Sequence, residues 1–242
     1  MSNKPVESPK KKIESVLLVE LAGEATSKLQ AIQSETEEQH VRSRHLNAAL
    51  KRIYQFMQTF SVHVNNIAPT IQRVYHVDSN TTYSELAWLN ALADFRKQSL
   101  SEKALVDHVA FSVRLQASEP VVVTRRWNQM DALKKELDVF GLRPLDDLDT
   151  LVRNKSKQET FSARLSPDFF MRIMFKGDYT EGLVEINGKN LDDFGMSNFR
   201  LNPEDATNEM LDDLGRFLIG RTDELPAALR LARFMPKVHR SC

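Results

Sequence analysis

Carboxylate and lysine side chains between residues 168 and 189 have the types needed for a metal-dependent nuclease. Asp168 follows a proline, Glu181 and Glu185 come next, and Lys189 closes the stretch. Such sites use carboxylates to bind Mg²⁺ and a nearby lysine to position water. The spacing departs from the usual acid-x-lysine pattern, because Asn187 stands two residues after Glu185. Asp168 after a proline is also ordinary turn chemistry. A metal-dependent hydrolase is therefore the third of three hypotheses.

Other catalytic patterns are missing from the sequence. It contains no phosphate-binding glycine motif, no zinc-enzyme spacing and no nucleophile elbow. None of the six histidines is paired at the i, i+4 spacing of a helix with a glutamate placed to act. The single cysteine, Cys242, cannot form an internal disulfide or a multi-cysteine zinc site. We expect a protein that is not an enzyme, holds no cofactor or metal and works in a reducing compartment.

Composition narrows the classes of partner. The 33 basic and 33 acidic side chains cancel, which argues against binding nucleic acid or membrane through bulk charge. The apolar run Val16 to Val19 follows three lysines but is interrupted by Glu20, so it is too short for a signal peptide. No stretch approaches the roughly 18 apolar residues of a membrane span. We expect a cytoplasmic protein without membrane contact.

Basic clusters give the second hypothesis, a nucleic-acid-binding component of a bacterial or phage complex. Arg125 and Arg126 stand beside Trp127, and further bases gather at both ends of the chain. The alternative is that these bases meet acidic residues of neighbouring elements. The candidate contacts are Lys10, Lys11, Lys12, Arg125, Arg126, Arg230, Arg233, Lys237 and Arg240.

A long helix is predicted over residues 13–78, after a basic tail at 1–12 that we expect to be disordered. Glycine and proline are both absent from Glu24 to Ala68, and these are the residues that end helices. Apolar residues follow an alternating three-and-four register, which is a heptad seam. The 50 residues from Leu18 to Ile67 would measure about 75 Å as a helix. The seam comprises Leu18, Ala22, Ala25, Leu29, Ile32, Leu46, Leu50, Ile53, Met57, Phe60, Val64 and Ile67, with Thr36, Gln39 and Ser43 at its polar centre.

Charge is segregated along this helix. Residues 14–38 hold six acids against Lys28 alone, whereas residues 41–77 hold five bases and no acid. This pattern favours antiparallel self-association, with the acidic half of one copy along the basic half of another. The alternative is a helix packed on its own chain or on a different protein. The expected interface residues are Leu29, Ile32, Leu46, Leu50, Ile53, Met57 and Phe60.

The remaining sequence predicts a helical hairpin partner and an α+β domain. Thr82 and Glu85 form a capping box, so residues 79–105 are expected to pair with the long helix as a second helix. Residues 106–242 alternate as strands and then as two amphipathic helices, with a candidate sub-boundary at 146–159. Asn187-Gly188 is a hairpin signal. The predicted fold class is α+β, with a long coiled-coil-like helix and helical hairpin, then an antiparallel sheet with helices on one face.

The first hypothesis for function combines these features. The sequence shows no set of catalytic residues, and its apolar seam is too long to be buried within its own domain. Both observations favour a non-enzymatic assembly or adaptor protein. It would self-associate or dock through the long helix and bind a protein partner with its α+β domain. We therefore expect a homo-oligomer, a larger protein complex, or both.

Overall fold

The computed structural model describes residues 16–153 and 159–233, and within them the fold is α+β, as predicted. The chain divides into two compact units, Met1–Arg42 and Ser43–Cys242. The helices are α1 (Val16–Ile67), the 3-10 turn η1 (Trp127–Gln129), α2 (Met130–Phe140), α3 (Leu148–Arg153), α4 (Asn208–Leu218) and α5 (Ala227–Leu231). The strands are β1 (Thr70–Ile71), β2 (Tyr75–His76), β3 (Thr82–Tyr83), β4 (Leu86–Lys97), β5 (Val106–Gln116), β6 (Val121–Arg126), β7 (Thr160–Leu165), β8 (Asp168–Asp178), β9 (Leu183–Lys189) and β10 (Met196–Leu201).

The long helix predicted over residues 13–78 is α1, but it ends earlier than predicted, at Ile67, and β1 and β2 lie within the last residues of the predicted span. It ends where Ala68 adopts a left-handed backbone conformation (φ 46°) and Pro69 follows. Every residue from Val16 to His40 is exposed, and the buried positions of α1 begin at Leu46. None of the described helices, α1 included, is both long and apolar enough to cross a membrane.

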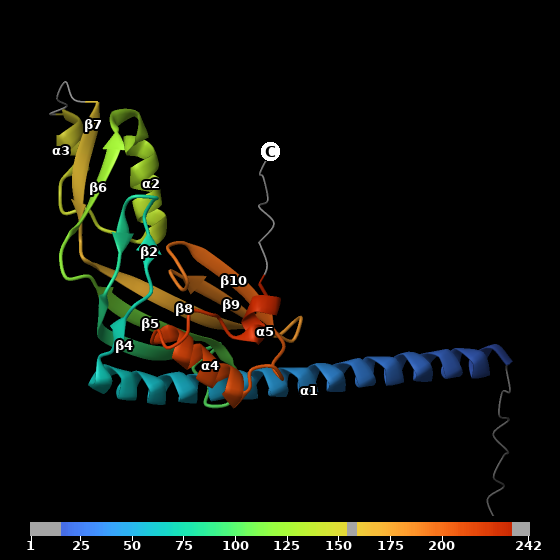
Figure 1. The fold of residues 1–242 in the computed structure, drawn as a ribbon. Coiled ribbons are helices and arrows are strands. Elements are labelled where there is room, and N and C mark those ends of the chain that lie inside the picture. Colours follow the sequence, from blue (N-terminus) through green and yellow to red (C-terminus); the bar gives the residue numbers. More distant parts are fainter. Residues whose placement is uncertain (1–15, 154–158, 234–242) are drawn as a thin grey trace, which may run out of the picture. The chain divides into compact units, whose positions relative to one another are not determined.

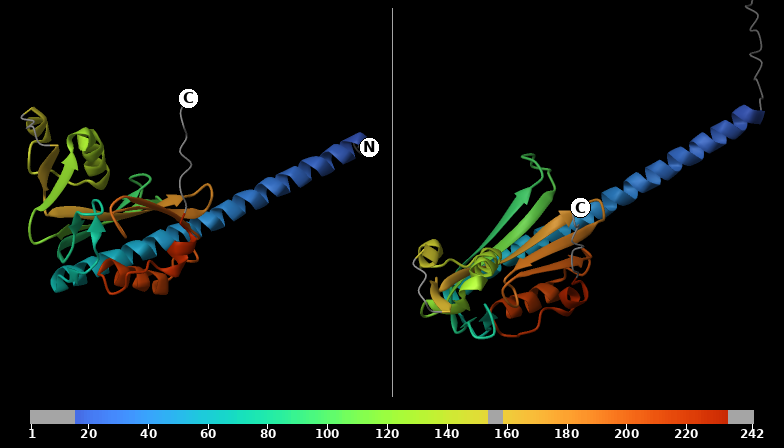
Figure 2. Two further views of the ribbon diagram at one scale, coloured as in Figure 1. Left: turned by 45° about the horizontal axis from the view of Figure 1, so that its top comes forward. Right: turned by 90° about the horizontal axis from the view of Figure 1, so that it is seen from above.

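The second unit is built on a six-stranded antiparallel sheet with strand order β1-β4-β5-β8-β9-β10. The part of α1 that belongs to this unit and α4 lie along the same face of the sheet (Figures 1 and 2). Inward residues of the strands form the core against these helices; Phe111 of β5, for example, contacts Phe60 of α1. A Cβ at Gly177 in β8 would lie 3.0 Å from Cδ1 of Leu50, so the missing side chain lets α1 approach the sheet closely.

A second, smaller sheet pairs β6 with β7; Trp127 of η1 contacts Phe161 of β7, and Arg125 of β6 lies 3.7 Å from Glu136 of α2. Residues 160–165 belong to this smaller sheet and not to the meander formed by the strands that follow them. β7 pairs with β6, while β8, β9 and β10 form the meander. Gly141 ends α2 in a left-handed conformation (φ 70°), as expected for a C-terminal glycine.

The first terminal helix, α4, begins at Asn208 and not at Asn202-Pro203, although asparagine and proline are favoured residues at a helix start. Thr207 is its N-cap, and its hydroxyl accepts a hydrogen bond from the Met210 backbone N–H at 3.1 Å. Asn202 instead starts a turn closed by the backbone N–H of Asp205.

The predicted helical hairpin at residues 79–105 is wrong, because this segment forms β3 and β4. Glu85, which we placed inside a capping box, has a positive φ of 50° that no helix accommodates. The ladder between β4 and β5 shifts register between Trp88 and Asn90. The buried residues Leu86, Trp88 and Ala91 are therefore spaced by two and then three, so the strand alternation is interrupted at this irregularity.

The hairpin predicted at Asn187-Gly188 is also displaced. Both residues lie inside β9, where Gly188 pairs with Ser197 of β10 and with Ile173 of β8. The turn between β9 and β10 comes after Lys189 and uses Asn190, which has a φ of 56°. The Asn190 side chain donates to two backbone carbonyls and accepts from Gly195 N–H, so it fixes the loop.

Candidate interaction surfaces

The carboxylate and lysine set does not assemble into a site. Glu185 pairs across the sheet with Lys176, eight residues along β8 from Asp168. At about 3.3 Å per residue the two carboxylates lie roughly 26 Å apart. Glu185 is instead paired with Arg200 at 3.2 Å. Within the described part of the chain, no group of three or more His, Cys, Asp or Glu side chains could hold a metal ion. The hydrolase hypothesis therefore has no assembled site among these residues.

Asp168 has a structural role at the start of β8. Its carboxylate accepts hydrogen bonds from the Ser166 hydroxyl and from Arg114 Nε at 2.8 Å, and Arg143 lies 3.3 Å away. Burial acts to raise the pKa of Asp168, but the Ser166 hydroxyl and the two guanidinium groups outweigh it. The pKa is therefore lowered, and the carboxylate stays ionised and ties β8 to its neighbours.

The candidate nucleic-acid contacts are divided between regions rather than brought together. Arg125 belongs to β6 and Arg230 to α5, and these elements lie at different ends of the domain (Figures 1 and 2). Arg125 forms an ion pair with Asp78 and lies 3.7 Å from Glu136. Ion pairs of this kind, with acidic residues of neighbouring elements, are the alternative to nucleic-acid contact for these bases.

The C-terminal arginines follow the same pattern. Arg230 pairs with Glu224 at 2.8 Å, and Arg233 pairs with Asp192 at 3.1 Å. Arg126 is exposed beside η1. Lys10, Lys11, Lys12, Lys237 and Arg240 lie outside the described residues. The four candidate arginines among the described residues, Arg125, Arg126, Arg230 and Arg233, thus form no common basic surface.

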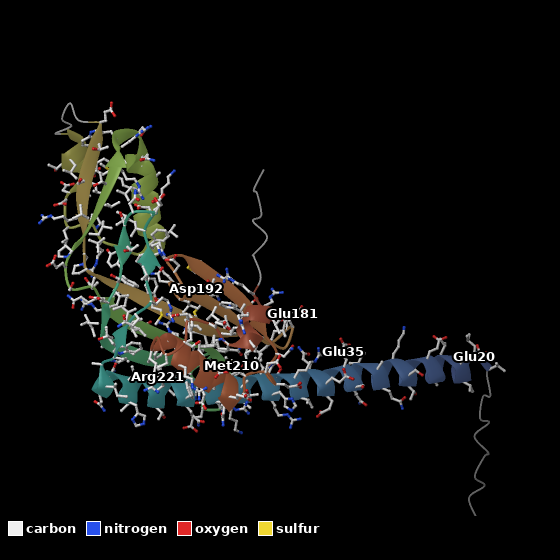
Figure 3. The ribbon with its side chains drawn as sticks, viewed as in Figure 1. Glu20, Glu35, Glu181, Asp192, Met210 and Arg221 are labelled. Atoms are coloured by element: carbon white, nitrogen blue, oxygen red, sulfur yellow. The ribbon has the colours of Figure 1, made fainter. Side chains whose placement is uncertain are left out.

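Six of the seven expected interface residues separate into two groups. Leu46, Leu50, Ile53 and Met57 are fully buried in the core of their own unit, which is the packing that we left open as an alternative. They are therefore not available to a partner, and their assignment to an interface is corrected. Leu29 and Ile32 are 60% and 59% exposed. Figure 3 shows the acidic side chains of Glu20 and Glu35 standing out from this exposed part of α1.

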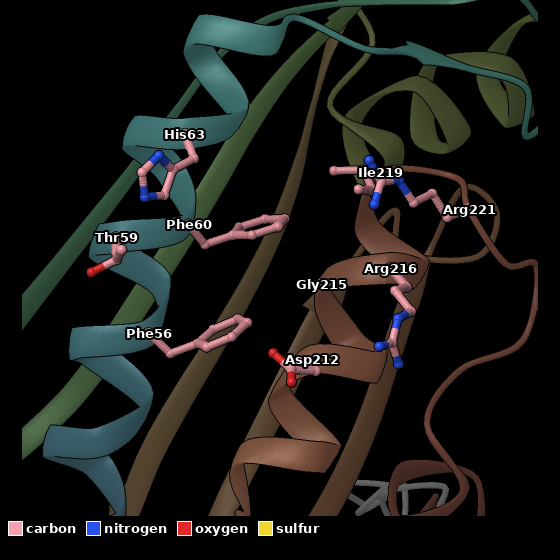
Figure 4. A pocket seen from close by; sticks show the side chains of 9 residues that line it. All are labelled: Phe56, Thr59, Phe60, His63, Asp212, Gly215, Arg216, Ile219 and Arg221. Atoms are coloured by element: carbon pink, nitrogen blue, oxygen red, sulfur yellow. The ribbon is translucent and has the colours of Figure 1, made fainter.

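Phe60, the remaining interface residue, lines a groove between α1 and α4 (Figure 4). Phe56 and Phe60 stack with their ring centroids 5.8 Å apart, and Gly215 leaves room for them on α4. The volume of the groove is about 360 Å³. Its rim carries His63, Asp212, Arg216 and Arg221.

The structure also reveals a basic surface that the sequence reasoning missed. The even-numbered residues of β8 face away from α1, and Phe170, Arg172 and Lys176 among them are exposed. The signal was present as the alternation of exposed and buried residues along this strand. The prediction of a strand here used only the buried apolar residues of this alternation, and not the exposed residues between them.

Comparisons with known proteins add nothing to these observations: no family model, curated protein or solved structure matches the chain.

Proposed function

We propose that this protein is an assembly module that self-associates through the exposed part of α1. The observation that supports the proposal is the apolar seam at Leu18, Leu29 and Ile32, which is 56% to 60% exposed on a well-formed helix. A helix is stable in water mainly through burial of its apolar face. An apolar stripe at heptad spacing is buried when it packs against the same stripe on a second copy of the helix.

The ends of the exposed seam favour an antiparallel pair in one register. The seam starts at Leu18, and Ser43 is its last position before the first buried residue, Leu46. An antiparallel pair that uses the whole exposed seam places Leu18 opposite Ser43 of the second copy. In that register Leu29 meets Ile32 of the other copy at the centre, and Ala25 meets Thr36. The Thr36 hydroxyl already donates to the Ile32 carbonyl at 2.7 Å, so burying it opposite alanine leaves no donor unpaired.

The charges flanking the seam select the same register independently. Lys28 and Glu35 occupy equivalent positions beside the seam, seven residues apart. When Leu18 opposes Ser43, Lys28 of each copy faces Glu35 of the other, which gives two opposite-charge pairs. A shift by one heptad step in either direction would place Lys28 opposite Lys28 or Glu35 opposite Glu35. In a parallel pair, Lys28 would face Gln33 instead.

The apolar area predicts a weak, reversible dimer. Fully burying one leucine or isoleucine side chain stabilises by about 1.5–3 kcal/mol, and these side chains start about 60% exposed. Six such side chains therefore contribute about 5–11 kcal/mol across the pair. Since association costs at least about 4 kcal/mol, the dissociation constant is expected to be no tighter than roughly 10 µM.

Analytical ultracentrifugation of the full chain between about 1 and 200 µM tests the proposal. We expect the mass to rise toward twice the chain mass of 27.7 kDa. The double substitution Leu29→Glu with Ile32→Glu should leave a monomer, because four charges would meet at the centre of the pair. Ser27→Glu with Ser34→Glu is the matched control, since it adds the same charge on the helix side away from the seam.

Two further experiments test the register. Lys28→Glu alone should weaken the dimer, and adding Glu35→Lys should restore it. In a Cys242→Ser background, a chain with Ala25→Cys should cross-link to a chain with Thr36→Cys but not to itself. A wild-type chain that stays monomeric at the highest concentration would overturn self-association. Cross-linking of Ala25→Cys to itself would overturn the antiparallel arrangement.

A further inference from the structure

The face of the six-stranded sheet that points away from α1 and α4 carries rows of side chains that run across five strands. The cross-strand register defines two rows that contain most of the basic residues. Row one is Leu92, Ser112, Arg172, Lys189 and Met196. Row two is Arg96, His108, Lys176, Glu185 and Arg200.

Several of these cations have no carboxylate to neutralise them. Among the described residues, no carboxylate lies within ion-pair distance of Arg96, Arg172 or Lys176. Arg172 donates instead to the Ser112 hydroxyl at 3.0 Å. The contrast is Arg200, which has Glu185 as its partner at 3.2 Å. The two rows together carry five formal positive charges and one negative charge, and the exposed Asp94 of β4 adds one negative charge in the row between them.

The arrangement of the cations opposes stability. Arg172 and Lys189 are directly opposite each other on neighbouring strands. Like charges in directly opposed positions destabilise a sheet. Lys189 lies against Gly141 at the carboxyl end of α2, where a helix dipole favours a cation, but Arg172 has no such support. An anion bound over this row would neutralise the repulsion between the two cations. Binding of an anion therefore gives a reason for a row that destabilises the free protein.

The remaining side chains of this face suit the bases of a nucleic acid. Phe170 is 50% exposed and lies two residues before Arg172 on the same face of β8. Between the two rows, Asn187 and Asn198 are directly opposite each other, and their amide groups can both donate and accept hydrogen bonds. Proteins that bind single strands combine a basic surface along the backbone with an aromatic ring on which a base stacks. A sheet face is too broad to enter a groove of duplex DNA.

We propose that this face binds single-stranded nucleic acid, with Arg172 and Lys176 on the phosphates and Phe170 stacked on a base. The two cations are four residues apart on one strand, or about 13 Å, so they contact different phosphates. This surface replaces the scattered arginines predicted from the sequence. It does not depend on self-association through α1.

Fluorescence anisotropy of the full chain with labelled oligo-dT and oligo-U at low salt tests this inference. We expect binding that weakens with salt. Arg172→Gln with Lys176→Gln should reduce the slope of log K against log salt by about 1.4, since each contact with a single strand contributes about 0.7. Lys51→Gln with Lys135→Gln is the matched control, because both lysines are exposed elsewhere. Its slope should equal that of the wild type.

The stacking role has its own test. Phe170→Ala should reduce affinity about five- to a hundred-fold, because stacking on an aromatic ring is lost. Phe170→Leu, which keeps apolar bulk without a ring, should lose affinity as well. The urea midpoint of Arg172→Gln with Lys176→Gln should not fall, which separates lost binding from lost folding. The inference is overturned if neither oligonucleotide binds at low salt, if the control weakens binding equally, or if poly-glutamate binds and the oligonucleotides do not.

Discussion

Leu50→Ala and Leu29→Ala make the same chemical change at two places on α1 and should have very different effects. Leu50 is fully buried between α1 and the sheet, close to Gly177 of β8. Leu29 is 60% exposed on the same helix. The comparison therefore isolates burial from helix propensity, because both substitutions replace leucine by alanine inside one helix.

The expected magnitudes follow from the burial of each side chain. Replacing a buried leucine by alanine costs about 2–5 kcal/mol of unfolding free energy, through lost burial and the cavity left behind. An exposed substitution costs within about 0.5 kcal/mol. With a urea dependence of about 3 kcal/mol per M, Leu50→Ala should lower the unfolding midpoint by about 0.7–1.7 M. Leu29→Ala should shift it by less than about 0.2 M.

Tryptophan fluorescence during urea unfolding is a suitable measurement. Trp88 is 3% exposed in β4, and its indole N–H donates to the Asn65 side chain of α1 at 3.1 Å. Its emission therefore reports the docking of α1 on the sheet. The unfolding should be followed at low protein concentration, where self-association contributes nothing. Equal midpoints for the two variants would refute the assignment of the second half of α1 to the core.

Three further predictions concern packing, capping and charge. Gly177→Ala should lower the urea midpoint, because overpacking against Leu50 costs about 1–3 kcal/mol; Gly23→Ala, where a Cβ meets nothing within 4 Å, should not lower it. Thr207→Ala should cost about 0.5–2 kcal/mol by removing the N-cap of α4, and Thr207→Ser should recover most of that loss in the same denaturation measurement. The lowered pKa of Asp168 means that its contribution to stability is present above the pKa of an unfolded aspartate, about 3.9, and is lost as the pH falls through the folded value. Asp168→Asn should therefore be less stable than the wild type at neutral pH, and the difference between their urea midpoints should narrow in acid; a constant difference would contradict this role.

The sequence predicts those features that depend on local chemistry. The long helix follows from the absence of glycine and proline over residues 24–68, and the end of α2 follows from Gly141. Alternation along β5 and β8 predicts strands with one buried face. These patterns arise from backbone geometry within a few residues, so they need no knowledge of the tertiary fold.

Features that depend on distant partners are not predicted. The seam continues in one register from Leu18 to Ile67, yet only its second half is buried, because the sheet and α4 that cover it come from later parts of the chain; Phe111, for example, stands 51 positions after Phe60, which it contacts. Similarly, β4 is rich in leucine and alanine, which favour helix, and its pairing with β5 overrides that preference. The basic sheet face appears only when the strands are placed side by side, since no strand contributes more than two of its five cations.

The order of elements along the chain has a consequence for synthesis on the ribosome. Met57 of α1 is completed 154 residues before Leu211 of α4, a helix on the same side of the sheet. At about 5–20 residues per second, this interval lasts roughly 8–30 s. Until the sheet strands and α4 have both been made, heptad positions that later enter the core are not fully covered. Neighbouring chains on one messenger would then present long helices to each other before either domain has closed. Under the proposed self-association, folding of the second unit is therefore the step that limits pairing to residues 18–43.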